Sequence, residues 1–216
     1  MRPQLVIGNK AYSSWSLRPW LAARHGGIDF EEIRIPLYTP DSVAQIRHYS
    51  PSGKVPAWRE GEFVVWESLA ICEYLAEQVP TLWPSDPKAR AVARSVSTEM
   101  HAGFTVLRTH MTMNARARGR NVPLTPEIAA DIDRIAEIWT DCRQRFGTGG
   151  PWLFGAFSIA DAMFGPVVLR FVPYSIKRPG VVDDYVANFM ADPHLKAWIA
   201  AAEQETEVLE PFEMGR

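Results

Sequence analysis

The sequence is poor in the residues that build disulfide frameworks and metal sites. It has two cysteines among 216 residues, and both Cys72 and Cys142 fall at apolar positions of helical patterns. This placement predicts two buried free thiols and a reducing compartment, because a disulfide scaffold or a zinc site needs more cysteines at characteristic spacings. Of the five histidines, His48, His101 and His110 have no partner at metal-ligand or catalytic-triad spacing. We therefore predict no metal site.

Long apolar runs and an excess of charge of one sign are also lacking. No run approaches the roughly 20 apolar residues of a membrane span, and residues 1–4 lack the apolar core of a signal peptide. Residues 1–80 carry 8 basic and 9 acidic side chains, and residues 81–216 carry 15 and 16. Neither part has the basic surplus of a nucleic-acid-binding protein. We predict a cytosolic protein with no membrane or nucleic-acid partner.

Short apolar runs alternate with helical patterns in the first 80 residues. Strands are expected at residues 5–7, 30–35, 57–59 and 63–65. Helices are expected at residues 17–24, at residues 43–47 and after Ser68. The resulting order, β-α-β-α-β-β-α, is that of a thioredoxin-like domain.

The rest of the sequence has helical periodicity. Residues 80–87 contain three prolines, which stop regular structure and predict a linker between a first domain at residues 1–79 and an all-helical domain at residues 88–216. Apolar residues recur at three- and four-residue spacing over residues 92–111 and again over residues 128–146, which predicts two antiparallel core helices. The expected fold class is α/β plus all-α, with the thioredoxin-like domain followed by a helical bundle.

Residues 51–68 have the order of parts expected of a peptide-binding site. Val55-Pro56 enters a strand, and an X-Pro bond there is where a cis peptide is most expected, because the trans preference is only about 0.5–1 kcal/mol. A cis bond would leave the N–H and C=O of Val55 free to pair with an extended peptide. Ser68 is predicted to cap the next helix, so that its hydroxyl and nearby free N–H groups can bind a carboxylate. Glu67 adds a negative charge that favours an ammonium group beside that carboxylate. These features predict a small zwitterionic peptide as the ligand.

This stretch resembles the glutathione-binding segment of the glutathione S-transferase superfamily, with its Val-Pro and Glu-Ser pairs. The resemblance implies that Val55 pairs with the cysteinyl backbone of glutathione and that Glu67 and Ser68 hold its γ-glutamyl end. It gives Pro56 a structural role. Similar lysines in plant transferases imply that Lys54 reaches the glycyl carboxylate, and a solvated loop lysine is an equally good interpretation.

A second motif lies in the helical part. Ser158 and Asp161 have the spacing of a capping box, in which each side chain satisfies a free N–H near the helix start, so their predicted role is stability. Together with the preceding run at residues 151–155, this motif resembles the capping and folding motif of the transferases' helical domain. The resemblance therefore covers essentially the whole chain. It implies glutathione as co-substrate, a homodimer and no metal.

The loop before the first helix carries the candidates for activating a bound thiol, whose ordinary pKa of about 8.5 leaves it mostly protonated at neutral pH. Ser13 stands five residues before an arginine, the spacing of the catalytic serine in serine-type transferases. Residues 13–16, Ser-Ser-Trp-Ser, also resemble the Ser-Ser-Cys-Ser of bacterial and other zeta-type enzymes, which include maleylacetoacetate isomerases. Ser13 is therefore the predicted donor to the thiolate, whereas Ser14 and Ser16 are interpreted as helix caps. Tyr12 is the alternative donor.

The predicted function is a glutathione transferase that adds the glutathione thiolate to small electrophiles. A glutathione-dependent cis-trans isomerase of the maleylacetoacetate type is an alternative, although Trp15 replaces the cysteine of its motif. A non-catalytic transferase-like binding module is another, although such modules normally lose the activating residue and Ser13 is present.

Four arginines of the helical part carry weaker functional signals. Arg108 aligns loosely with a glutathione-contacting position of zeta-type enzymes, and it also fits a surface residue of a long helix. Arg116, Arg118 and Arg120 are predicted to complement a helix C-terminus.

Overall fold

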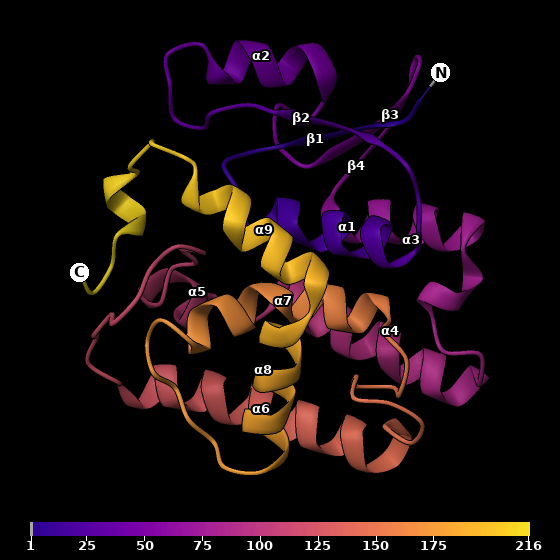
Figure 1. Cartoon of the computed structure of the whole chain (residues 1–216), viewed down its shortest axis with the longest axis vertical. Coiled ribbons are helices and arrows are strands. Elements are labelled where there is room, and N and C mark those ends of the chain that lie inside the picture. The colour runs from indigo at the N-terminus through magenta and orange to yellow at the C-terminus, as the bar shows by residue number, and fades with distance from the viewer. Residues whose placement is uncertain (1) are drawn as a thin grey trace.

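The computed structural model describes residues 2–216, and its first part is built on a small four-stranded sheet (Figure 1). The strands are β1 (Gln4–Ile7), β2 (Glu31–Arg34), β3 (Ala57–Glu60) and β4 (Phe63–Trp66), in the spatial order β2-β1-β3-β4. β1 pairs parallel with β2 and antiparallel with β3, which pairs antiparallel with β4. A parallel pair needs a crossover connection, and a helix supplies it between β1 and β2.

Helices cover both faces of this sheet. They are α1 (Ser14–His25), α2 (Ser42–Tyr49) and α3 (Ser68–Gln78). In Figure 1, α2 lies on one side of the strands, and α1 and α3 lie together on the other. Side chains alternate along β1, so that Val6 packs with Ile46 of α2 while Leu5 belongs to the larger core shared with α1 and α3. The predicted order of elements is confirmed, and the region is thioredoxin-like.

The rest of the described chain is helical and is organised around α7. Its elements are α4 (Pro87–Ala102), α5 (Thr105–His110), α6 (Pro126–Phe146), α7 (Ile159–Phe171), α8 (Val181–Ala191), α9 (Pro193–Glu203) and the short 3-10 helix η2 (Glu210–Phe212). Every residue of α7 is buried, and α7 packs against both α1 and α4. Gly165 permits the close approach to α1, because a Cβ at that position would lie 2.8 Å from Leu21 Cδ1. Within residues 2–216, no helix has the length and apolar character needed to cross a membrane.

The single long helix predicted over residues 92–111 is wrong, because the chain breaks between α4 and α5. Gly103 is extended, and Phe104 is left-handed with a φ of 57°. A Cβ on Gly103 would lie 2.8 Å from the carbonyl oxygen of Glu99, so this position requires glycine. The apolar periodicity continues across the break because both helices pack on the same core. The glycine was the signal in the sequence that marks the break.

The segment between α3 and α4 is packed against the helices that it joins. It contains the 3-10 helix η1 (Pro80–Leu82), and the Trp83 indole N–H donates to the Glu73 carboxylate at 3.0 Å. Asp86 accepts from the Ala89 N–H at 2.7 Å and thereby caps α4. The main apolar core continues past this segment, from the helices beneath the sheet into the helical part.

Candidate active site

The residue Val55, just before β3, has backbone groups without partners in the described part of the chain. The Val55-Pro56 bond is cis, as predicted. The pairing of β3 with β1 begins at Ala57, so Val55 lies outside the ladder. No backbone hydrogen bond within residues 2–216 uses the N–H or C=O of Val55. Both groups are therefore available to an extended peptide.

Glu67 and Ser68 form a strained corner at the start of α3. The prediction that Ser68 caps α3 is wrong by one position, because Glu67 is the N-cap and Ser68 is the first helical residue. Glu67 has a φ of 71°, a conformation that costs a residue with a side chain of order 1–3 kcal/mol and that tends to occur at functional sites. The Ser68 hydroxyl is buried and has no hydrogen-bond partner within residues 2–216. A buried hydroxyl without a hydrogen-bond partner destabilises the folded protein, and a ligand that bonds to it removes this cost.

The structure brings the four predicted glutathione-binding residues together. A cavity of about 170 Å³ is lined by Lys54, Val55, Glu67 and Ser68, with Trp15 and Ser52 among the other lining residues. A second cavity of about 890 Å³ shares Trp15, Lys54 and Val55 with the first. Its other walls come from the loop before α1, the loop before α2, α2 itself, α5, α7 and η2. A peptide in the small cavity would thus border a larger space for a second molecule.

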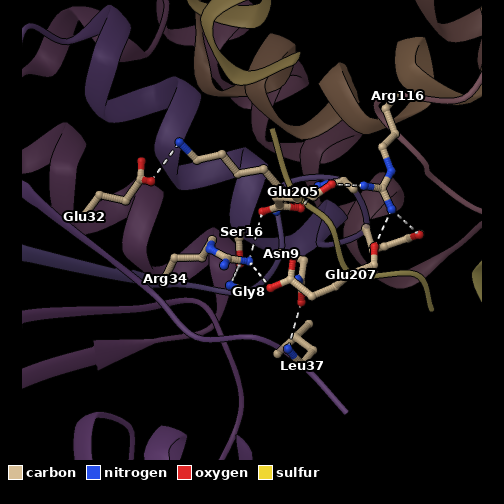
Figure 2. Close-up of polar contacts among 12 residues, drawn as sticks. Gly8, Asn9, Ser16, Glu32, Arg34, Leu37, Arg116, Glu205 and Glu207 are labelled. Atoms are coloured by element: carbon tan, nitrogen blue, oxygen red, sulfur yellow. Dashed lines mark hydrogen bonds and ion pairs between the residues drawn. The ribbon is translucent and has the colours of Figure 1, made fainter. Parts of the chain in front are cut away.

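Ser13 lines the large cavity and also caps α1. Its Oγ accepts from the Ser16 N–H at 3.4 Å and donates to the Ser16 Oγ at 2.7 Å, and the Ser16 Oγ accepts from the Gly8 N–H at 3.1 Å (Figure 2). The interpretation of Ser14 and Ser16 as caps is wrong, because both lie inside α1 and Ser13 is the N-cap. Ser14 also lines the large cavity, as the first residue of α1. Ser13 thus lies where the positive end of a helix dipole meets the cavity.

Tyr12 is already engaged by other groups. Its hydroxyl donates to the Glu213 carboxylate at 2.6 Å and accepts from Arg116 at 2.9 Å and from the Leu209 N–H at 3.3 Å. Burial and the bond to Glu213 raise the pKa of Tyr12. A fully bonded phenol is not free to donate to a ligand, which favours the serines over Tyr12.

The predicted role of Arg116, Arg118 and Arg120 at a helix C-terminus is wrong. They lie in the loop between α5 and α6, and two of them bind the end of the chain. Arg116 donates to the carbonyl oxygens of Glu205 and Glu207 (Figure 2), and Arg120 forms an ion pair with Glu213. Their spacing in the sequence did not reveal these partners, which are about 90 residues away.

Two arginines line the large cavity, and a third is buried behind one of its walls. Arg108 and Arg170 line it, and no Asp or Glu does. Arg18 is buried behind Trp15, with its guanidinium 4.3 Å from the ring centroid and with Nε and Nη1 lacking partners within residues 2–216. Burial and the neighbouring Arg170 and Arg108 lower the pKa of Arg18 to about 9, so it stays charged at neutral pH. Sequence reasoning missed Arg170, which lies on the apolar helix α7.

Trp15 lines both cavities, and His101 packs behind it. The His101 Nε2 lies 3.9 Å from a carboxylate oxygen of Glu67, and its ring meets the Trp15 ring edge-on at 5.2 Å. Arg108 lies over the same indole at 5.3 Å and donates to the His101 carbonyl oxygen. Burial, Arg18 and Arg108 lower the pKa of His101 despite the raising effect of Glu67. This imidazole is therefore neutral at physiological pH.

The two cysteines and the predicted capping residues Ser158 and Asp161 line neither cavity. Cys72 and Cys142 are buried free thiols, as predicted, and burial raises the pKa of each to about 12. The Asp161 carboxylate accepts from the Ser158 N–H at 2.8 Å, the Leu153 N–H at 3.0 Å and the Tyr185 hydroxyl at 2.9 Å. Among residues 2–216, no three His, Cys, Asp or Glu side chains are placed to hold a metal ion.

Both parts of the chain match known protein families. The family model of the glutathione S-transferase N-terminal domain matches residues 12–78, and that of the C-terminal domain matches residues 125–201. The chain is 26% identical to maleylacetoacetate isomerase of Rattus norvegicus over 77% of each protein. It is 33% identical to a probable maleylacetoacetate isomerase of Caenorhabditis elegans, but this match spans only about half of each protein, 48%.

A solved structure with the same architecture is a glutathione transferase homologue from Burkholderia with bound glutathione. It matches with a TM-score of 0.68 and 21% identity, and the match covers 94% of this chain and 98% of that one. At this identity the likeness shows the fold.

Proposed function

Because the chain belongs to the glutathione S-transferase superfamily, we propose that it binds glutathione in the small cavity and adds its thiolate to an electrophile in the large one. One observation carries this proposal. The buried, unpartnered Ser68 hydroxyl, the Glu67 carboxylate and the free backbone of Val55 line one small cavity. They offer a donor, an anion and a strand edge to a peptide that has a carboxylate, an ammonium group and an extended backbone.

The proposed roles follow from this arrangement. Val55 pairs with the cysteinyl backbone, Ser68 and Glu67 hold the γ-glutamyl carboxylate and ammonium, and Lys54 pairs with the glycyl carboxylate. Because Lys54 and Val55 also line the large cavity, the cysteinyl sulfur faces the wall that carries Ser13.

Ser13 is the proposed activating residue. Its hydroxyl hydrogen now points to Ser16 and would rotate toward the sulfur, while Ser16 donates its own hydrogen to the Ser13 Oγ. The Gly8 N–H keeps the Ser16 Oγ in place during this exchange. A hydroxyl donor and the positive end of α1 together lower a thiol pKa by about one to two units. The thiol proton passes to solvent, and the thiolate forms a bond to the electrophilic carbon. In a substitution, the leaving group departs with the electron pair of the broken bond. In a conjugate addition, the electron pair of the double bond passes to the neighbouring carbon, which takes up a proton.

The test is to measure glutathione binding by calorimetry and the thiolate titration of the complex by ultraviolet absorbance. We expect binding with a thiol pKa of about 6.5–7.5, below the ordinary value of about 8.5, and turnover of neutral electrophiles such as 1-chloro-2,4-dinitrobenzene. Absence of glutathione binding would reject the proposal. Binding without a lowered pKa or turnover would instead favour the non-catalytic module.

A second candidate is the glutathione-dependent isomerase, and the arginines favour it. Maleylacetoacetate carries two carboxylates, and the large cavity presents Lys54, Arg108 and Arg170 with no acidic residue. The rat and nematode relatives carry isomerase names. Against it stands Trp15, which occupies the position of the cysteine in the isomerases' motif.

Substrate charge separates the two candidates. We expect Arg108→Gln to lower kcat/KM for an acidic substrate about tenfold or more relative to a neutral one, because a charge-assisted hydrogen bond is worth about 1.5–3 kcal/mol. Rapid turnover of maleylacetoacetate, with little activity toward neutral electrophiles, would assign the isomerase.

Three further expectations belong to this proposal. The chain forms a domain at residues 1–79, a linker at residues 80–87 and a helical domain at residues 88–216, it acts in the cytosol, and it works as a homodimer. Sedimentation at micromolar concentration tests the last point, since a single species near the chain mass of 24.3 kDa would contradict it.

A further inference from the structure

The loop that carries Ser13 has two backbone donors that it cannot satisfy itself. Within residues 9–13, the N–H groups of Tyr12 and Ser13 both donate to the carbonyl oxygen of Asn9, at 3.1 Å and 2.8 Å. This turn leaves the N–H groups of Lys10 and Ala11 pointing outward. Buried amides of this kind need a partner from elsewhere in the chain.

The Glu205 carboxylate supplies both bonds. One oxygen accepts from the Lys10 N–H at 2.7 Å and the other from the Ala11 N–H at 2.9 Å. Only 5% of the Glu205 side chain is exposed, although it lies just beyond α9 in a segment that is otherwise at the surface. A carboxylate is the one side chain that offers two equivalent acceptors to two neighbouring N–H groups.

Other bonds hold Glu205 itself in place. Arg116 donates to the carbonyl oxygen of Glu205, and Arg34 approaches its carboxylate at 3.4 Å while binding Glu207 at 2.9 Å (Figure 2). On the same loop, the Trp198 indole N–H donates to the Lys10 carbonyl oxygen at 2.9 Å. The loop before α1 is thus fixed from outside by the last helix and the segment that follows it.

We propose that Glu205 is a positioning residue. It holds the loop of residues 9–13 so that Ser13, the N-cap of α1, faces the bound thiol. This inference rests on the proposed function, because it assigns Glu205 a part in thiolate stabilisation. Glu205 does not touch the glutathione cavity, whose lining comes from Trp15 and residues 52–68. Its loss should therefore change the thiolate and leave glutathione affinity intact.

The test uses Glu205→Gln in the full-length protein. An amide has one acceptor oxygen and would turn its NH2 group toward the second backbone donor, so the loop loses one bond and gains a repulsion. We expect the pKa of bound glutathione to rise by about one unit and turnover at pH 6.5 to fall roughly tenfold, with the dissociation constant of glutathione changed less than about twofold. Glu205→Asp, which keeps two acceptors, should recover part of the shift.

Glu203→Gln is the matched control, because Glu203 is exposed, lies two residues away and, among residues 2–216, pairs only with Arg118. It should behave as the wild type. Arg116→Gln is the second variant, since it releases the carbonyl oxygens of Glu205 and Glu207 and the Tyr12 hydroxyl but leaves the Glu205 carboxylate intact. It should raise the thiol pKa in the same direction by a smaller amount.

The outcomes separate this inference from the function on which it rests. Wild-type protein that binds no glutathione would reject the proposed function itself. If the wild type lowers the thiol pKa and Glu205→Gln leaves that pKa unchanged, the inference fails alone. It fails equally if the variant loses glutathione affinity and turnover in the same proportion. Should Glu205→Gln not fold, an unshifted pKa in Arg116→Gln would overturn it.

Discussion

The two sides of the candidate active site differ in how the chain builds them. Apart from Trp15, the glutathione side comes from residues 52–68, one hairpin and the first residue of α3. The opposite side takes Ser13 from the start of α1, Arg108 from α5, Arg170 from α7 and Phe212 from η2. The first side is local in sequence. The second is assembled from five distant segments, because the loop before α2 and α2 itself also line the large cavity.

In the proposed function the two sides have different tasks. The local side recognises glutathione, and the assembled side activates its thiol and holds the electrophile. A backbone edge, a buried hydroxyl and a carboxylate suit one peptide and need no distant partner. The assembled side depends on packing between α1 and α7 and on the bonds that tie residues 9–13 to the end of the chain. Changes on the local side should therefore alter affinity for glutathione, and changes on the assembled side should alter the thiolate.

The largest expected effect comes from Ser13→Ala on the assembled side. Loss of a charge-assisted hydrogen bond should raise the pKa of bound glutathione by about one to two units and lower turnover at neutral pH roughly ten- to a hundredfold. Glutathione affinity should change little. The pH–rate profile should shift upward by the same amount as the thiolate titration, which is read by ultraviolet absorbance.

Ser14→Ala is the control for this prediction, because Ser14 lines the same cavity but does not cap α1. Since Ser13 is the cap, Ser13→Ala should also cost about 1 kcal/mol of stability, seen in denaturant unfolding. A variant that loses this stability but keeps its thiolate titration would give Ser13 a structural role only. A larger loss in Ser14→Ala would transfer the activating role to Ser14.

A smaller effect is expected from Glu67→Ala on the local side. The charge-assisted bond to the ammonium group is worth about 1–3 kcal/mol, but 55% of the Glu67 side chain is exposed, so we expect the low end, about fivefold weaker binding. The thiol pKa of the complex should stay as in the wild type. Calorimetry gives the affinity, and an unchanged dissociation constant would remove Glu67 from the site.

The smallest effect concerns His101, which lies where the two sides meet. Its pKa in the folded protein is below the ordinary 6.5, so the unfolded chain takes up the proton first as pH falls. Stability is therefore lost as pH drops through about 6.5, and it is fully present above that value. In His101→Gln the fall of Tm between pH 7.5 and pH 5.5 should shrink by about 1–2 °C. A His101 pKa above 6.5 by nuclear magnetic resonance would contradict the prediction.

The sequence by itself determined the elements and the parts of the site that are close together along the chain. Alternating and helical periodicities predict β-α-β-α-β-β-α followed by helices, because burial of one face imposes a repeat of two or of about 3.6. The cis bond at Val55-Pro56 and the corner at Glu67-Ser68 were predictable because each depends on neighbouring residues. Two of the errors are local as well: the cap of α3 lies one residue earlier than predicted, and Gly103 breaks a helix whose apolar repeat continues.

Only the tertiary structure decided which distant groups face the large cavity. Arg170 lies on a fully buried helix whose apolar neighbours predict packing, and its approach to Arg108 depends on how α5 and α7 meet. Glu205 reaches Lys10 and Ala11 across about 190 residues, through backbone donors that no sequence pattern marks. Periodicity records which face of an element is buried, but it carries no information on which other element covers that face, and here the covering elements supply half of the site.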